Sequence, residues 1–250
     1  MSMLTPSLEP SMNPKPFGGK SYGSIGHLPS SRLGPGDHKI EDGQARILTE
    51  RTRDRHDLVI VQEKLDGSNV GIGKVGGQII PVTRAGWRAE SSPFEQHHLF
   101  AVWVARQWDR WDVLLAEGER LCGEWLAQAH GTRYTLPHEP FVAFDLFRDG
   151  QRVLWEELSD RCARASIVNP TVLHHGGPCS IDTAMTRLSV HGHHGAIDPA
   201  EGAVWRCERK GRVDFLGKFV RPDKVDGIYL PEVSGQGALW NWKPTNEATA

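Results

Sequence analysis

The chain has 250 residues, of which 38% are hydrophobic and 24% are charged, and its formal net charge is −2. These values are ordinary for a soluble globular domain and exclude an overall basic field, so binding of nucleic acid would need a local basic face. No apolar run is long enough to cross a bilayer, and the first thirty residues lack the core of a signal peptide. We therefore expect a cytoplasmic protein with no membrane partner.

Residues 1–38 are rich in Pro, Gly and Ser and show no hydrophobic period. This composition predicts a flexible or arm-like segment, disordered over about its first fifteen residues. Within it, Tyr22 to Arg32 carries larger side chains among small ones and is expected to form an ordered arm against the main domain. The main domain is predicted over 39–234, followed by a tail over 235–250 that carries Trp240 and Trp242.

The main domain alternates strand-like and helix-like patterns. Alternating or continuous apolar runs predict strands over 58–63, 70–75, 78–82, 120–126, 141–147, 203–207 and 213–220. Helices are predicted over 43–57, 93–108, 155–165 and 180–188, with a further turn or helix at Trp111 and Leu114 and with Ser180 as an N-cap. Antiparallel strands interrupted by helices favour the α+β class over a doubly wound sheet.

Cysteine and histidine patterns do not favour a metal centre. The four cysteines include no C-x-x-C pair, which disfavours a zinc site or a disulfide framework. Two histidine clusters, His174-His175 and His191 with His193 and His194, are flanked by glycine. Both are predicted to be solvated loops without a metal ligand role.

The most informative motif is Lys64-Leu65-Asp66-Gly67, which follows the apolar run Val59 to Val61. A lysine at the end of a rigid strand, followed by a tight turn, has the placement that a lysine nucleophile needs. A free lysine is protonated at neutral pH, so desolvation and neighbouring positive charge would have to lower its pKa. The motif by itself fits a surface hairpin turn equally well.

Further motifs follow in a fixed order. They are Gly123-Glu124-Trp125, the run FVAFDL with Phe144 and Asp145, EGAVWR opened by Glu201, and FLGKFVR around Lys218. The series from Leu58 to Lys224 resembles the covalent nucleotidyltransferases, which comprise ATP-dependent DNA ligases, RNA ligases and GTP-dependent capping enzymes. KLDGSN, AFD and the length look most like RNA ligases of the double-strand-sealing type. The resemblance implies an antiparallel-sheet fold like a ligase adenylation domain, with flanking helices.

The resemblance also implies a reaction and a set of site residues. Lys64 would attack the α-phosphorus of ATP and pyrophosphate would leave. The lysine-linked AMP would then pass to a 5′-phosphate, and a 3′-hydroxyl would displace AMP to join the two strands. The implied nucleotide-binding residues are Glu63, through its backbone, with Asn69, Arg84, Glu124, Phe144 and Lys218. The implied metal ligands for Mg²⁺ or Mn²⁺ are Glu201 and Asp145. The family often has a second lysine two residues after Lys218, where this chain has Val220, so Arg221 or Lys224 is expected to supply that charge.

RNA ends or a nicked duplex are the implied partners. We expect no separate oligonucleotide-binding barrel after Lys224, so local basic residues and the Tyr22–Arg32 arm are expected to hold the nucleic acid. The candidates are Arg206, Arg209, Lys210, Arg212 and Arg221. Four alternatives remain open: a DNA ligase of the same fold, a capping-type guanylyltransferase, a 5′-adenylating enzyme, and an inactive module that binds RNA ends.

Overall fold

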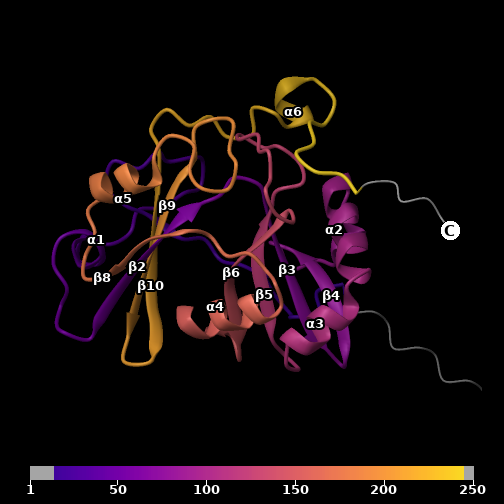
Figure 1. Ribbon diagram of the computed structural model, residues 1–250, viewed down its shortest axis with the longest axis horizontal. Coiled ribbons are helices and arrows are strands. Elements are labelled where there is room, and N and C mark those ends of the chain that lie inside the picture. Colours follow the sequence, from indigo (N-terminus) through magenta and orange to yellow (C-terminus); the bar gives the residue numbers. More distant parts are fainter. Residues whose placement is uncertain (1–13, 245–250) are drawn as a thin grey trace, which may run out of the picture.

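The structure is a computed structural model, and it describes residues 14–244. Two five-stranded sheets form its centre (Figure 1). The first sheet has the order β1 (Gly26–His27), β10 (Arg212–Val220), β9 (Gly202–Arg209), β2 (Asp57–Lys64) and β8 (Val172–Gly176). The second has the order β4 (Gln78–Thr83), β3 (Ser68–Val75), β5 (Arg120–Trp125), β6 (Phe141–Arg148) and β7 (Gln151–Arg152). All neighbouring strands are antiparallel except β1 and β10.

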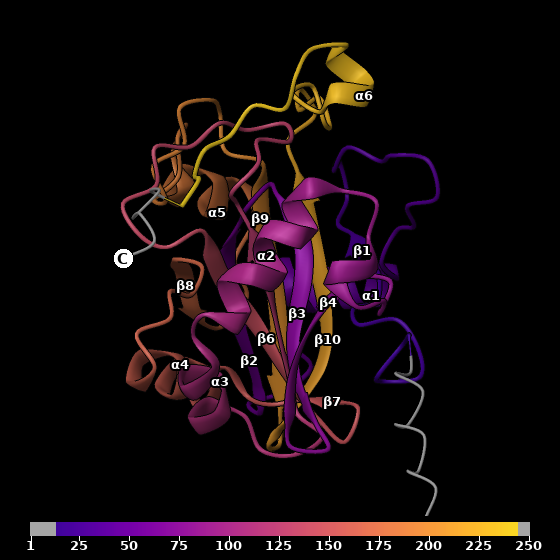
Figure 2. The ribbon, with the colours of Figure 1, turned by 90° about the vertical axis from the view of Figure 1, so that its right-hand side faces the viewer.

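Helices cover the outer faces of the two sheets, as Figures 1 and 2 show. The first sheet packs against α1 (Asp42–Thr49) and α5 (Ile181–Leu188), and the second packs against α2 (Glu95–Ala105) and α3 (Trp108–Leu114). The remaining helices are α4 (Trp155–Arg164), α6 (Pro231–Ser234) and a 3₁₀ turn (Ala89–Ser91). The predicted α+β class is confirmed. No helix in residues 14–244 is long and apolar enough to span a membrane.

Side-chain alternation along β2 explains how the first sheet builds both a core and a site. Val59 and Val61 are fully buried among the side chains of α1, α5 and β9. Gln62 and Lys64 point to the opposite face, because successive residues of a strand project to opposite sides. That opposite face looks across a cleft towards the second sheet.

The predicted strands are all present, with bounds that differ by at most two residues. The helix predicted over 43–57 ends at Thr49, and Glu50 is its C-cap. The following segment forms a turn, in which the Arg53 backbone N–H donates to Asp57 Oδ2 at 2.7 Å. The helix predicted over 93–108 begins at Glu95 and ends at Ala105, and α3 follows as a separate helix. Ser180 is the N-cap of α5, as predicted, and its Oγ accepts from Thr183 N at 3.2 Å.

The strands and helices that were not predicted from the sequence are short. β1, β7 and β8 contain five residues or fewer, and α6 contains four. The prediction of a solvated loop at His174-His175 is wrong, since both residues lie on β8 and pair with β2. The same prediction is wrong for His194, which is 3% exposed and contacts His138 and Thr171.

The described part of the N-terminal segment contacts both sheets. Tyr22 and Leu28 are buried, and β1 pairs with β10. Gly71 and Gly73 on β3 make room for this segment: a Cβ added at Gly71 would lie 2.8 Å from Ser21 Oγ, and one at Gly73 would lie 1.9 Å from the Phe17 ring. The predicted disorder over the first fifteen residues falls almost entirely outside the described residues. Near the other end of the chain, Trp242 packs edge-on against Trp125.

Candidate active site

A cavity of about 1040 Å³ opens in the cleft between the two sheets. It brings together every residue that the sequence assigned to the nucleotide or the metal. These are Glu63, Lys64, Asn69, Arg84, Glu124, Phe144, Asp145, Glu201 and Lys218. They come from β2, β3, β5, β6, β10 and the chain segments beside β4 and β9. A volume of this size is at the upper end of the range for small-molecule and cofactor sites.

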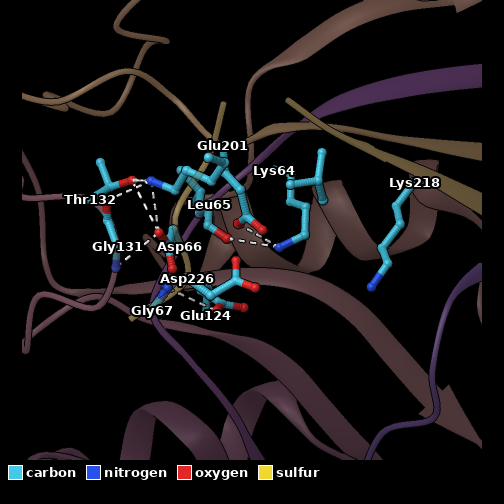
Figure 3. Close-up of polar contacts among 12 residues, drawn as sticks. Lys64, Leu65, Asp66, Gly67, Glu124, Gly131, Thr132, Glu201, Lys218 and Asp226 are labelled. Carbon is cyan, nitrogen blue, oxygen red and sulfur yellow. Dashed lines mark hydrogen bonds and ion pairs between the residues drawn. The ribbon is translucent and has the colours of Figure 1, made fainter. Parts of the chain in front are cut away.

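The KLDG turn is rigidly held beside this cavity. Gly67 has no room for a side chain, since a Cβ there would lie 2.5 Å from the carbonyl oxygen of Trp125. The Asp66 carboxylate accepts from the backbone N–H of Gly131 at 3.1 Å and pairs with Lys224 at 3.0 Å (Figure 3). Each contact fixes the turn from a different segment of the chain, so the position of Lys64 is well defined.

The Lys64 amine forms an ion pair with Glu201, with 2.6 Å between Nζ and Oε2. Burial lowers the pKa of this amine, but the negative charges of Glu201 and Glu124 outweigh burial and raise the pKa above its usual value. The lowered pKa that a lysine nucleophile requires is therefore not found in the conformation described. Lys64 is an ammonium group here and must lose a proton before it can act as a nucleophile.

Carboxylates crowd the space around Lys64. Burial raises the pKa of Glu124 to about 7, against the opposing charge of Lys64, and its Oε1 accepts from Gly67 N at 3.1 Å. Burial also raises the pKa of Glu201. Residues 14–244 hold no preformed group of three or more His, Cys, Asp or Glu side chains suited to a metal. One or two carboxylates completed by water and phosphate oxygens suit Mg²⁺, and Glu201 with Glu124 fits that description.

Lys218 and Lys224 occupy different environments. Lys218 lines the cavity and extends into the same space as Lys64 (Figure 3), where burial and the charge of Lys64 lower its pKa. Its Nζ lies 3.4 Å from Asp37 Oδ1.

Lys224 is buried outside the cavity lining and neutralises Asp66. Arg221 also lies outside the lining, and its backbone N–H donates to the Glu201 carbonyl at 3.0 Å. In this conformation, neither of the two alternatives lines the cavity.

Two cavity residues were missed in the sequence. Gln62 is 4% exposed, and its Nε2 is a buried donor without a hydrogen-bond partner among the described residues. Strand alternation could have found it, because it lies two residues before Lys64 and faces the same side. Tyr22 also lines the cavity, and no sequence pattern connects it to the motifs. The Asn69 Oδ1 is a buried acceptor that likewise lacks a partner in the described chain.

The side chain of Glu63 points away from Lys64. Its carboxylate accepts from His193 N at 2.9 Å, and burial raises its pKa to about 7. The Glu63 carboxylate therefore lies on the side of His193, and the contact of the Glu63 backbone with a nucleotide stays a prediction.

Two assignments need correction. Asp145 is 1% exposed and both its oxygens are occupied: Oδ1 accepts from Arg206 at 2.5 Å, and Oδ2 accepts from Tyr22 and Arg152 at 2.6 and 2.8 Å. A carboxylate already satisfied by two cations and a hydroxyl is unsuited to a metal. Arg206 is fully buried and also pairs with Glu208, so its predicted contact with nucleic acid is wrong. Both residues instead join the two sheets.

Three of the other predicted nucleic-acid contacts lie far from Lys64, namely Arg209, Lys210 and Arg212. On β9, Gly202 pairs with Lys64 whereas Arg209 pairs with Asp57, seven residues further along the strand. At a rise of roughly 3.3 Å per residue, this separation is about 23 Å. Arg209 forms ion pairs with Asp54 and Asp57. Lys210 and Arg212 are exposed around the turn between β9 and β10.

Comparisons with solved structures identify the fold. Naegleria gruberi RNA ligase with PPi has a TM-score of 0.53 at 16% identity, covering 91% of this chain and 64% of that one. A mutant of the same ligase with ATP and Mn has a TM-score of 0.52 at 14% identity, covering 78% and 59%. A putative ATP-dependent DNA ligase from Aquifex aeolicus has a TM-score of 0.50 at 16% identity, covering 80% and 49%. The chain thus spans 49% to 64% of the length of these three structures.

The order of motifs, the cavity between the sheets and the shared fold agree with the comparison of sequences. No curated protein matches the chain. The family model described as RNA ligase matches residues 57–220, which is more than half of the chain and includes the elements from β2 to β10. The chain therefore belongs to the RNA ligase family.

Proposed function

We propose that this chain is an ATP-dependent RNA ligase-like nucleotidyltransferase that forms a lysyl-AMP at Lys64 and seals 5′-phosphate and 3′-hydroxyl ends of RNA. The observation that carries the proposal is the Lys64 amine, held by Glu201 at 2.6 Å inside a cavity lined by all the nucleotide-binding motifs. Family membership supports the reaction class. The structures of Naegleria gruberi RNA ligase solved with ATP and Mn support the choice of ATP and a divalent metal.

In the first step, Lys64 Nζ forms a bond to the α-phosphorus and the bond from that phosphorus to pyrophosphate breaks. The ammonium proton must leave first, and the Glu201 carboxylate is within hydrogen-bond distance to accept it. A divalent cation held by Glu201 and Glu124 would supply positive charge that lowers the pKa of Lys64 and neutralises phosphate oxygens. Lys218 lies on the cavity wall, where it can neutralise the charge that develops on the phosphate.

Other residues bind and orient the nucleotide. Phe144 presents a half-buried ring to the cavity and would stack on the adenine. The partnerless Gln62 amide would donate to a base acceptor, which gives a buried polar atom a reason to lack a protein partner. Glu124 would accept from ribose hydroxyls, and the exposed Arg84 guanidinium would pair with phosphate oxygens.

A labelling experiment tests the proposal. The chain is incubated with ATP labelled on the α-phosphate and with Mg²⁺ or Mn²⁺, and label on the protein is followed on a denaturing gel. Wild type should retain the label, which should then move to a 5′-phosphorylated nick whose other strand ends in ribonucleotides. A chain that takes no label from any nucleoside triphosphate contradicts the proposal. Label from GTP alone favours a capping-type enzyme, and equal sealing of an all-DNA nick favours a DNA ligase.

A further inference from the structure

The described N-terminal segment is built into the wall of the nucleotide cavity. Tyr22, Gly23 and Ile25 line the cavity itself. The backbone N–H groups of Ser21 and Tyr22 both donate to the carbonyl oxygen of Arg84, at 3.0 and 3.2 Å. The glycines of β3 leave space for this segment, as described above. The segment therefore contacts the loop of a predicted phosphate ligand on one side and the cavity on the other.

Tyr22 is the central residue of this contact. It is 6% exposed, and its hydroxyl donates to Asp145 Oδ2 at 2.6 Å. Its ring meets the Phe144 ring edge-on, with 5.1 Å between centroids and an interplanar angle of 72°. A second edge-on contact joins it to Phe147 at 6.0 Å. Edge-to-face pairs in this range are favourable and hold both rings at a defined angle.

Charged groups fix Tyr22 from the other side. Asp145 is held by Arg206 and Arg152, and the Arg152 guanidinium lies 5.2 Å from the centroid of the Tyr22 ring. Burial and the charge of Asp145 raise the pKa of Tyr22 well above its usual value, so the hydroxyl stays protonated and remains a donor. Because Asp145 directly follows Phe144 on β6, the hydroxyl and the ring of Tyr22 restrain two consecutive residues of one strand.

We propose that Tyr22 is a positioning residue for nucleotide binding, which holds the Phe144 ring at the angle needed to stack on the nucleobase. This inference rests on the proposed function. It assigns the segment around Tyr22 to the nucleotide site, in contrast to the expectation that the Tyr22–Arg32 arm grips nucleic acid. It also explains why Asp145, adjacent to the stacking ring, is tied into ion pairs and does not face a metal.

Equilibrium binding of α,β-methylene-ATP tests the proposal in the full chain, because this analogue cannot release pyrophosphate and so reports binding alone. Tyr22→Leu removes both ring and hydroxyl and should weaken binding about tenfold, within the range for loss of one base stack. Tyr22→Phe keeps the ring and should weaken binding of the analogue by about threefold or less. Tyr229→Phe, which changes a tyrosine outside the cavity lining, should bind as wild type does.

Two further measurements separate positioning from a general structural role. Tyr22→Leu combined with Phe144→Leu should bind no more weakly than Phe144→Leu alone, because Tyr22 acts through that ring. Inorganic tripolyphosphate has no base, so its affinity should be the same in wild type and Tyr22→Leu. Unchanged analogue binding in Tyr22→Leu, multiplied losses in the double variant, or equal loss of tripolyphosphate would overturn the inference. If wild type binds the analogue but forms no lysyl-AMP from ATP, only the proposed function fails.

Discussion

At the scale of single residues, Lys64 shows what a sequence motif can and cannot predict. The motif located the lysine, because KLDG and its strand are contiguous in the chain. The charges around Lys64 could not be predicted from the motif, because Glu201 is 137 residues distant in the chain and contacts Lys64 only after β2 and β9 have paired. Carboxylates surround the amine and raise its pKa, which is the opposite of the shift that a lysine nucleophile requires.

The role of Glu201 leads to a prediction about binding and chemistry. Glu201→Ala should slow AMP transfer to Lys64 by about 100-fold or more, because the variant loses both the proton acceptor and the charge that would hold a divalent cation. Binding of α,β-methylene-ATP should change by less than about threefold, since Glu201 is not proposed to contact the base or ribose. Single-turnover labelling and analogue titration give the two values. Equal losses in the rate of AMP transfer and in the affinity for the analogue would show that Glu201 is neither the proton acceptor nor the metal ligand.

Glu63 gives a prediction about stability and pH. Its pKa is raised from 4.5 to about 7 in the folded chain, so its contribution to stability is fully present below pH 4.5 and is lost as the pH rises through 7. Glu63→Gln keeps an acceptor for His193 N and carries no charge. It should therefore exceed wild type by roughly 2–3 kcal/mol in free energy of unfolding at pH 8, and by little near pH 4.5. Denaturant unfolding at the two pH values measures this, and a difference that does not depend on pH would refute it.

At the scale of elements, the long strands were predictable and the short ones were not. β2, β6 and β10 contain eight or nine residues with clear apolar patterns. β8 carries two histidines and a glycine at the edge of a sheet, and its sequence, VLHHG followed by Gly177, is equally compatible with a loop. Pairing with β2 decides its conformation, which is a tertiary effect that local propensity does not contain.

The two lysines after β9 should respond differently to substitution. Lys218→Met should slow AMP transfer by tenfold or more at nearly unchanged stability, because Lys218 lines the cavity. Lys224→Met should lower the free energy of unfolding by roughly 1.5–3 kcal/mol, because it leaves the half-buried Asp66 carboxylate without its cation. Labelling kinetics and denaturant unfolding on both variants test this. The reverse pattern would mean that Lys224 supplies the phosphate contact.

At the scale of the whole molecule, the site exists only where the two sheets face each other. The sequence identified its members in order, but not that Asp145 and Arg206 pair with each other between the sheets. It also missed that Tyr22, on the N-terminal segment, reaches the cavity. No periodic pattern marks such long-range contacts, so these roles required the tertiary structure.

The distance between the cavity and the turn that joins β9 to β10 gives a prediction about nucleic acid. A duplex would have to extend about seven base pairs from the nick, at 3.4 Å per pair, to reach Lys210 and Arg212 from Lys64. Replacing both by Ala should therefore impair sealing of a long nicked duplex and reduce its salt dependence, while AMP transfer stays at the wild-type rate. A substrate with arms of about four base pairs is the control. Equal effects on both substrates would contradict contact at this turn.

The identity of the residue that carries AMP tests the account most directly. The wild-type chain is incubated with ATP and Mg²⁺ or Mn²⁺, kept at neutral or alkaline pH because a phosphoramidate is labile in acid, and mapped by peptide mass spectrometry. AMP should be found on Lys64 alone, within VIVQEKLDGSNVGIG, and Lys64→Ala should carry none. AMP on another residue, or undiminished labelling of Lys64→Ala, would contradict the account.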